Sequence, residues 1–296
     1  MSNTLLVTGA SGQLGRRVVH HLLHTLQVPA ARIIATTRKP DALADLAAEG
    51  VVVRQADFED PASMARAFVG VQRLLLISTD ALDRPDRRLE QHRAAVAAAV
   101  HAGVNHVVYT SMLKPEPGSP IPFAPDHFGT EQALANSPLS WTVLRNSWYM
   151  ENLYQNLPQV LISGQWFTAA SDGKVAHVSR EDCARAASAA LASTSAEKAI
   201  YNITGAAARS TVEIASLASD VLGKPIAVVQ VPADDLARGM AAAGVPGFLV
   251  PLLVAFDVNT ALGRVGEVSN DFYTLTGTAP QALREFLVVN KAAFGC

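Results

Sequence analysis

The first half of the chain alternates short apolar runs with segments whose apolar residues recur at helical spacing. Six of the runs lack polar alternation, which is typical of strands that are covered on both faces. The expected strands are Leu5–Thr8, Ile33–Thr36, Val51–Arg54, Leu74–Ser78, Val107–Ser111 and Trp141–Leu144. The regular succession of strand and helix predicts an α/β fold, with a doubly wound parallel sheet and helices on both faces.

Helical patterns separate these runs. Leu14, Val18, Leu22 and Leu26 share one face of a helix. A second helix opens at Pro61, where the missing N–H costs little. A longer Ala-rich helix over about 85–102 ends at a glycine that suits a helix C-cap.

The second half is less regular. Four helices and one short apolar run are expected there: Arg180–Ala192, Thr211–Leu222, Pro246–Leu262, Pro280–Asn290 and the run Ile226–Val231. We therefore expect residues 1–150 to form the sheet domain. Residues 151–296 would form mainly a smaller substrate lobe over the carboxyl ends of the strands, with some elements returning to the sheet.

Composition narrows the class of protein. Apolar residues make up 49% and charged residues 17% of the 296 residues, and the net charge is −2. This balance disfavours nucleic acid or a membrane as a partner, and it leaves a homodimer open. The stretch Phe248 to Phe256 is too short to span a bilayer. The first residues lack the basic region and the longer hydrophobic segment of a secretory signal, so no signal peptide is expected. Cys183 and Cys296 form no CxxC pair, so we expect a protein of the reducing cytoplasm.

A glycine-rich turn joins the first expected strand to the first expected helix. Gly9 permits a sharp turn, Gly12 lets backbone N–H groups approach a pyrophosphate, and Gly15 lets the helix pack closely on the strand. The helix N-terminus adds free N–H groups and a partial positive charge. The same glycines also suit a purely structural turn. The expected phosphate contacts are Gly9, Ala10, Ser11, Gly12, Gln13 and Leu14.

The second expected strand runs into Thr36-Thr37-Arg38-Lys39. A site selective for NAD usually places an acidic residue here, which accepts a hydrogen bond from the ribose 2′-hydroxyl. Arg38 instead offers charge-assisted hydrogen bonds to a 2′-phosphate, which predicts NADP(H) as the cofactor. The alternative is a solvated basic residue at a helix start.

Polar residues follow the next strands at the edge where a ligand crevice forms in such sheets. The Asp57 carboxylate would accept from an adenine amino group while Phe58 packs on the ring. Alternatively, Asp57 only caps the following helix. Ser78, Thr79 and Ser111 end the fourth and fifth strands, so they are expected to contact the cofactor.

With these residues together, the chain resembles the atypical branch of the short-chain dehydrogenase/reductase superfamily, whose glycine spacing is GxxGxxG. Within it, the chain is similar to the NmrA-like group, especially bacterial NAD(P)H:quinone oxidoreductases and triphenylmethane reductases. The matching segments are 8–15, 54–57, 109–111, 144–149, 170–174 and 243–246. The resemblance implies a Rossmann-type fold in which Gly9 to Leu14 and Arg38 hold NADPH.

The resemblance also places residues 143–148 beside the nicotinamide. Asn146 would then hydrogen-bond the nicotinamide or its ribose, with Ser147 and Trp148 next to it. Without the resemblance, this segment is a strand end followed by an aromatic helix start. In that interpretation Trp148 and Tyr149 are packing residues.

The YxxxK pair of most short-chain dehydrogenases is missing. His127 and Glu131 stand at the corresponding spacing, which disfavours ordinary alcohol–ketone chemistry. A quinone or a cationic dye accepts a hydride without strong acid catalysis, so binding it flat against the nicotinamide would supply most of the catalysis. His127 is then a proton donor, a structural or cofactor contact, or a metal ligand; no third ligand suggests itself, so we predict no metal site.

The acceptor pocket is expected to be flat and apolar. Phe123, Tyr149 and Phe248 are candidate pocket residues, and Trp148, Tyr154 and Phe256 lie in the same segments; all of them also suit core positions. The predicted function is NADPH-dependent hydride transfer to a quinone or a similar small aromatic acceptor. The alternative is a non-catalytic NAD(P)-sensing regulator. A nucleotide-sugar epimerase is disfavoured, because it would need the Tyr and Lys of the missing YxxxK pair.

Overall fold

A computed structural model describes residues 4–295, so Met1 to Asn3 and Cys296 lie outside the described part. Its centre is a seven-stranded sheet in the order β3-β2-β1-β4-β5-β6-β9, and every neighbouring pair is parallel. The strands are β1 (Leu5–Val7), β2 (Ile33–Thr37), β3 (Val52–Gln55), β4 (Arg73–Leu76), β5 (His106–Met112), β6 (Ser140–Asn146) and β9 (Ala199–Ile203).

The predicted fold class is confirmed, because all six expected strands are present and the strand order reverses between β1 and β4. This reversal is the switch point at which a doubly wound sheet opens its ligand crevice. The seventh strand, β9, pairs with β6 and comes from the second half of the chain.

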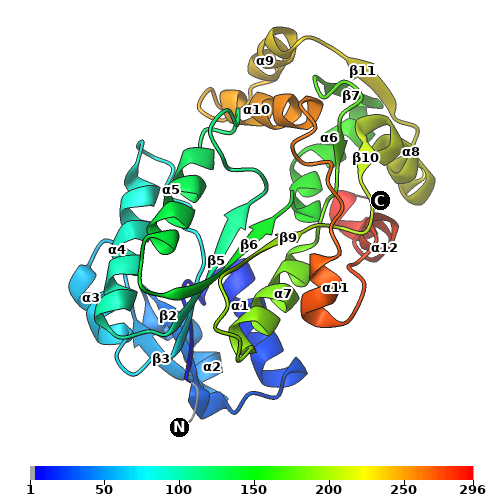
Figure 1. Cartoon of the computed structure of the whole chain (residues 1–296). Coiled ribbons are helices and arrows are strands. Elements are labelled where there is room, and N and C mark those ends of the chain that lie inside the picture. The colour runs from blue at the N-terminus through cyan, green and yellow to red at the C-terminus, as the bar shows by residue number, and fades with distance from the viewer. Residues whose placement is uncertain (1–3, 296) are drawn as a thin grey trace.

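Helices cover both faces of the sheet (Figure 1). One face carries α1 (Gln13–His20), α7 (Arg180–Ala192) and α11 (Asp271–Thr276); the other carries α3 (Pro61–Ala67), α4 (Arg87–His101) and α5 (Ala124–Ala135). The first helix is shorter than its pattern predicts, because it passes into a π-helical turn over His21–Thr25. A short helix, α2 (Ala44–Ala48), precedes β3.

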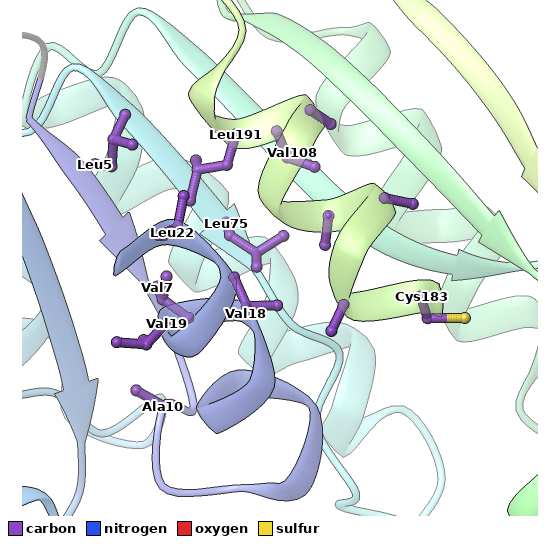
Figure 2. Close-up of a cluster of buried hydrophobic side chains, with 14 of the residues drawn as sticks. Leu5, Val7, Ala10, Val18, Val19, Leu22, Leu75, Val108, Cys183 and Leu191 are labelled. Atoms are coloured by element: carbon purple, nitrogen blue, oxygen red, sulfur yellow. The ribbon is translucent and has the colours of Figure 1, made fainter. Parts of the chain in front are cut away.

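The core beneath α1 and α7 fixes the position of the glycine turn. Figure 2 shows Val7 and Leu75 of the sheet meeting Val18 of α1, with Leu191 of α7 beside them. Each of these side chains is fully buried. Burying an aliphatic side chain of this size stabilises the fold by about 1.5–3 kcal/mol, so α1 is held firmly over β1.

The remaining elements form a second group above the carboxyl ends of the strands (Figure 1). They are α6 (Leu153–Ser163), β7 (Gln165–Thr168), β8 (Lys174–Val175), β10 (Arg209–Ser210), α8 (Thr211–Leu222), β11 (Ala227–Gln230), α9 (Ala233–Ala242), α10 (Val250–Ala261) and α12 (Leu283–Val289). β11 pairs with β7, and β10 with β8. This group has its own core, in which Leu157, Ile214 and Phe286 are buried.

Two helices of the second half, α7 and α8, have the bounds that their sequence patterns predict. α10 and α12 begin later than expected. Pro251 stands in the first turn of α10, and the backbone at Ala282 is extended just before α12. Among the described helices, none combines the length and the apolar character needed to cross a bilayer.

Candidate active site

The glycine turn after β1 has the geometry that a phosphate-binding turn needs. Gly9 has φ +59°, in the left-handed region that favours glycine. A Cβ on Gly12 would lie 3.3 Å from the Gly9 carbonyl oxygen, and one on Gly15 would lie only 2.4 Å from it. The turn therefore leaves no room for side chains between α1 and β1, and the first N–H groups of α1 stay without intrahelical partners.

The side chains of the turn divide between core and surface. Ala10 is buried, and its N–H donates to the Thr36 carbonyl over 2.9 Å. Ser11 is exposed and its hydroxyl lies 2.9 Å from that of Thr37. Leu14 packs against the core, whereas Gln13 is exposed. The turn thus presents backbone N–H groups, one hydroxyl and one amide to a ligand.

Arg38 follows β2 directly and its side chain is exposed. The capping alternative for Asp57 is wrong, because the Asp60 side chain accepts the Ala62 N–H and caps α3. The Asp57 carboxylate instead accepts the Glu59 N–H over 3.0 Å. Phe58 is half-buried and packs against the core under α3 and α4. Contacts of Arg38, Asp57 and Phe58 with a cofactor stay predictions.

Three buried polar atoms near the strand ends have no hydrogen-bond partner within residues 4–295: Thr79 Oγ1, Asn146 Oδ1 and Ser147 Oγ. The Asn146 amide nitrogen donates to Tyr149 Oη, over 3.3 Å. Orphaned buried polar groups are costly, so they point to a ligand that carries hydroxyl and amide groups. A nicotinamide and its ribose carry these groups. Thr79, Asn146 and Ser147 therefore fit the nicotinamide half of a dinucleotide. The glycine turn fits the phosphates of the same dinucleotide.

A cavity of about 600 Å³ opens at the same strand ends. Its sheet side is formed by residues 78–80 after β4, 110–113 at the end of β5 and 146–149 after β6. Its opposite side is lined by residues of α10, which lies beyond the ends of β5 and β6 (Figure 1), together with residues of α6 and α8. The volume is in the range of small-molecule sites.

Aromatic side chains wall this cavity. Phe123, Trp148 and Phe256 line it, and the ring centroids of Trp148 and Phe256 are 3.7 Å apart. Tyr149 lines it as well. Phe248 does not: its side chain is 81% exposed, because α10 begins after it and the residue lies in the preceding turn. The prediction of Phe248 as a pocket residue is therefore wrong.

Tyr154, the other aromatic residue of these segments, packs in the core of the second group. Its ring contacts Phe286 and Phe294.

His127 lies in a buried polar network beside the cavity. Arg88 Nη2 lies 2.9 Å from His127 Nε2, and Tyr109 Oη lies 2.8 Å from His127 Nδ1. Because a guanidinium only donates, Nε2 is the acceptor and Nδ1–H donates to Tyr109. Burial and the nearby Arg88 and His92 hold the pKa of His127 well below its usual range. His127 is thus a neutral imidazole, and the proton-donor role stays a prediction that these contacts do not favour.

Glu131 joins three elements instead of acting on a ligand. It accepts from Ser111 Oγ over 2.6 Å and from Arg145 Nη2 over 2.6 Å. Arg145 also pairs with Glu116 in the loop after β5, over 2.7 Å. At the spacing of the missing YxxxK pair, this chain therefore carries a buried ion pair that fixes α5 against β5 and β6.

The polar cavity residues that carry no motif in the sequence include Arg88, His177, Arg180 and Asp257. Arg180 Nη1 donates to Gln13 Oε1 over 3.0 Å, so it links the cavity to the glycine turn. One signal was available for Arg88. Arg88, His92 and Val96 repeat every fourth residue on the buried face of α4, and a charge on such a face indicates a function or a partner. Within residues 4–295, no cluster of three His, Cys, Asp or Glu side chains is arranged to hold a metal ion.

Comparisons with known proteins agree with this geometry. The model of the NmrA-like family matches residues 1–279. The chain is 36% identical over 281 residues to quinone oxidoreductase 2 of Escherichia coli, covering 95% of this chain and 96% of that protein.

Solved structures are also similar. The structure of the Escherichia coli NADPH-dependent quinone oxidoreductase with NADPH has a TM-score of 0.90, 35% identity, and coverage of 96% of this chain and 98% of that one. Citrobacter triphenylmethane reductase complexed with NADP(H) has a TM-score of 0.89, 34% identity, and coverage of 97% and 100%. This chain therefore belongs to the NmrA-like family.

Proposed function

We propose that this protein is an NADPH-dependent oxidoreductase that reduces quinones or similar conjugated aromatic acceptors. The observation that carries the proposal is the aromatic-walled cavity, which opens at the strand ends where Thr79, Asn146 and Ser147 hold orphaned polar atoms. The similarity of the whole chain to quinone oxidoreductase 2 and to triphenylmethane reductase supports the same chemistry. The low cysteine content supports the cytoplasm as the proposed compartment.

Each group of residues has a role in this proposal. Bound NADPH would supply the hydride. The glycine turn and the N-terminus of α1 bind its phosphates, and Arg38 binds the 2′-phosphate. Thr79, Asn146 and Ser147 orient the nicotinamide end. The rings of Trp148 and Phe256, which contact each other, form an aromatic wall against which the acceptor packs, so that most of the rate enhancement comes from proximity and orientation.

The proton follows a different route from that in YxxxK enzymes. A hydride converts a quinone into a hydroquinone monoanion, and one proton from solvent completes the hydroquinone. This phenolate is a weak base, so general acid catalysis contributes little. The neutral His127, whose Nδ1–H is directed at Tyr109, fits a positioning role better than proton donation.

The test is turnover by the purified protein. NADPH oxidation is followed by the absorbance of the reduced nicotinamide, with menadione, a conjugated ketone and a triphenylmethane dye as acceptors. We expect turnover with menadione. NADPH binding measured by calorimetry is the control for a folded cofactor site. Tight NADPH binding without turnover of any acceptor would overturn the proposal and favour a dinucleotide-sensing regulator.

A further inference from the structure

Arg88 occupies a place that helix stability does not explain. It is the second residue of α4, lines the cavity, and is only 7% exposed. A cation in the first turn of a helix opposes the helix dipole, and a buried cation loses its hydration. These costs are expected to be offset by a partner that the guanidinium binds.

The hydrogen bonds of Arg88 leave most of its donors unused. Within residues 4–295, its single hydrogen-bonded partner is His127, and its Nε has none. No described carboxylate lies within 4.0 Å of its nitrogens, although Asp80 and Asp126 are close enough to act on its charge. Because arginine stays protonated at neutral pH, the cavity contains a buried guanidinium without a counter-ion in contact.

The surroundings of Arg88 define the kind of ligand that would provide the counter-ion. Its guanidinium carbon lies 5.2 Å from the centroid of the Phe123 ring, and the ring centroids of Phe123 and Phe256 are 6.3 Å apart. These two rings contact each other edge to face, so they form one aromatic wall that reaches the guanidinium, and a planar aromatic ligand packed on this wall would place a ring substituent near Arg88. The planar fork of arginine pairs well with carboxylate or enolate-type oxygens.

The other cation that lines the cavity, Arg180, is already engaged, and neither of the lining carboxylates, Asp80 and Asp257, lies within 4.0 Å of the Arg88 nitrogens. Arg180 already donates to Gln13 and lies over the Tyr149 ring, 5.1 Å from its centroid. Asp257 is held by Thr168 Oγ1 and the Ala169 N–H, both at 2.7 Å. Arg88 is thus the cavity's available cation in the described part of the chain.

We propose that Arg88 recognises an anionic oxygen on the acceptor, and that the preferred acceptors are acidic quinones, which carry an ionised hydroxyl or carboxylate on the aromatic ring. This inference rests on the proposed quinone reductase function. Arg88 acts in it as a specificity-determining residue, and His127 holds it in place through the bond to Nη2.

The experiment compares Arg88→Gln with the wild-type protein on two acceptors of the same shape. Lawsone, a hydroxynaphthoquinone that is anionic at neutral pH, is the acidic acceptor, and its methyl ether is the neutral one. Comparing each acceptor with itself cancels their different electrophilicity. We expect kcat/KM for lawsone to fall about 10- to 100-fold, as for a lost hydrogen bond to a charged group, and that for the methyl ether to change less than about threefold.

Two further variants separate recognition from structure. Arg93→Gln removes an exposed arginine of the same helix, and it is expected to leave both acceptors unaffected. Arg88→Lys keeps the charge and is expected to recover part of the preference for lawsone. Equal losses on both acceptors in Arg88→Gln would overturn charge recognition while leaving the quinone reductase function intact.

A binding measurement covers the case in which neither acceptor is reduced. Lawsone binding is measured by quenching of tryptophan fluorescence, since Trp148 lines the cavity. Binding that weakens at least about tenfold in Arg88→Gln supports anion recognition even if the proposed reductase function fails. Binding of equal strength in both proteins overturns it.

Discussion

Replacing Gly15 by alanine tests whether the close contact of α1 with β1 builds the phosphate-binding turn. The new Cβ would lie 2.4 Å from the Gly9 carbonyl oxygen and 2.8 Å from the Ala10 Cα. Both are backbone atoms, so no side chain can rotate away. Ordinary contact needs about 3.5–4.0 Å, so helix and turn must separate by about 1 Å.

The expected magnitude follows from two opposing effects. Alanine in place of glycine inside a helix normally stabilises by about 1 kcal/mol. Overpacking a close-packed site costs about 1–3 kcal/mol, and here the neighbours are held by a fully buried core that includes Val7 and Val18. We expect the free energy of unfolding of Gly15→Ala to fall by about 1–2 kcal/mol. Because the N–H groups that bind phosphate move with the turn, the NADPH dissociation constant should rise at least about tenfold.

The assays are urea unfolding followed by circular dichroism and NADPH titration by calorimetry. Gly239→Ala is the matched control, because Gly239 lies inside α9 and an added Cβ there meets nothing within 4 Å. This control should be as stable as the wild type or up to about 1 kcal/mol more stable, with unchanged NADPH affinity. If Gly15→Ala also keeps both its stability and its NADPH affinity, the turn tolerates the displacement and the reasoning is refuted.

Four other perturbations are informative. Arg38→Ala should raise the NADPH dissociation constant about 10- to 100-fold and leave that for NADH unchanged in calorimetry; equal effects would exclude a 2′-phosphate contact. His127→Ala should lower quinone turnover by less than about tenfold without moving the pH profile, whereas loss of a general acid costs about 100-fold or more. Glu131→Ala should lower the free energy of unfolding by about 3 kcal/mol because it leaves Arg145 partly unpaired, and an unchanged urea midpoint would contradict this. Burial, with the nearby Arg73, lowers the pKa of His106 to about 4 in the folded protein. Between pH ~6.5 and pH ~4 the unfolded chain therefore binds more protons than the folded protein, and the free energy of unfolding falls as the pH falls through this window. In urea melts, His106→Gln should remove about 2 kcal/mol of that loss at pH ~4.5, and an unchanged pH slope would contradict the assignment.

The sequence determined the sheet and the glycine turn because their signals are local. A strand covered on both faces needs a continuous apolar run, so Val107–Ser111 indicated β5 without reference to any other segment. The turn needs glycine where φ is positive and where the helix touches the strand, as at Gly9 and Gly15.

Only the tertiary structure decided which residues line the cavity. Phe123 and Phe248 looked alike in the sequence, yet Phe123 contacts His127 and Phe256, whereas Phe248 is exposed before α10. Likewise, the sequence shows Arg88 only as one basic residue in an Ala-rich helix. Its contact with His127 depends on how α4 packs against α5 and β5. A cavity is the space that side chains from distant segments leave between them, so its lining depends on how those segments pack and not on the local pattern of any one of them.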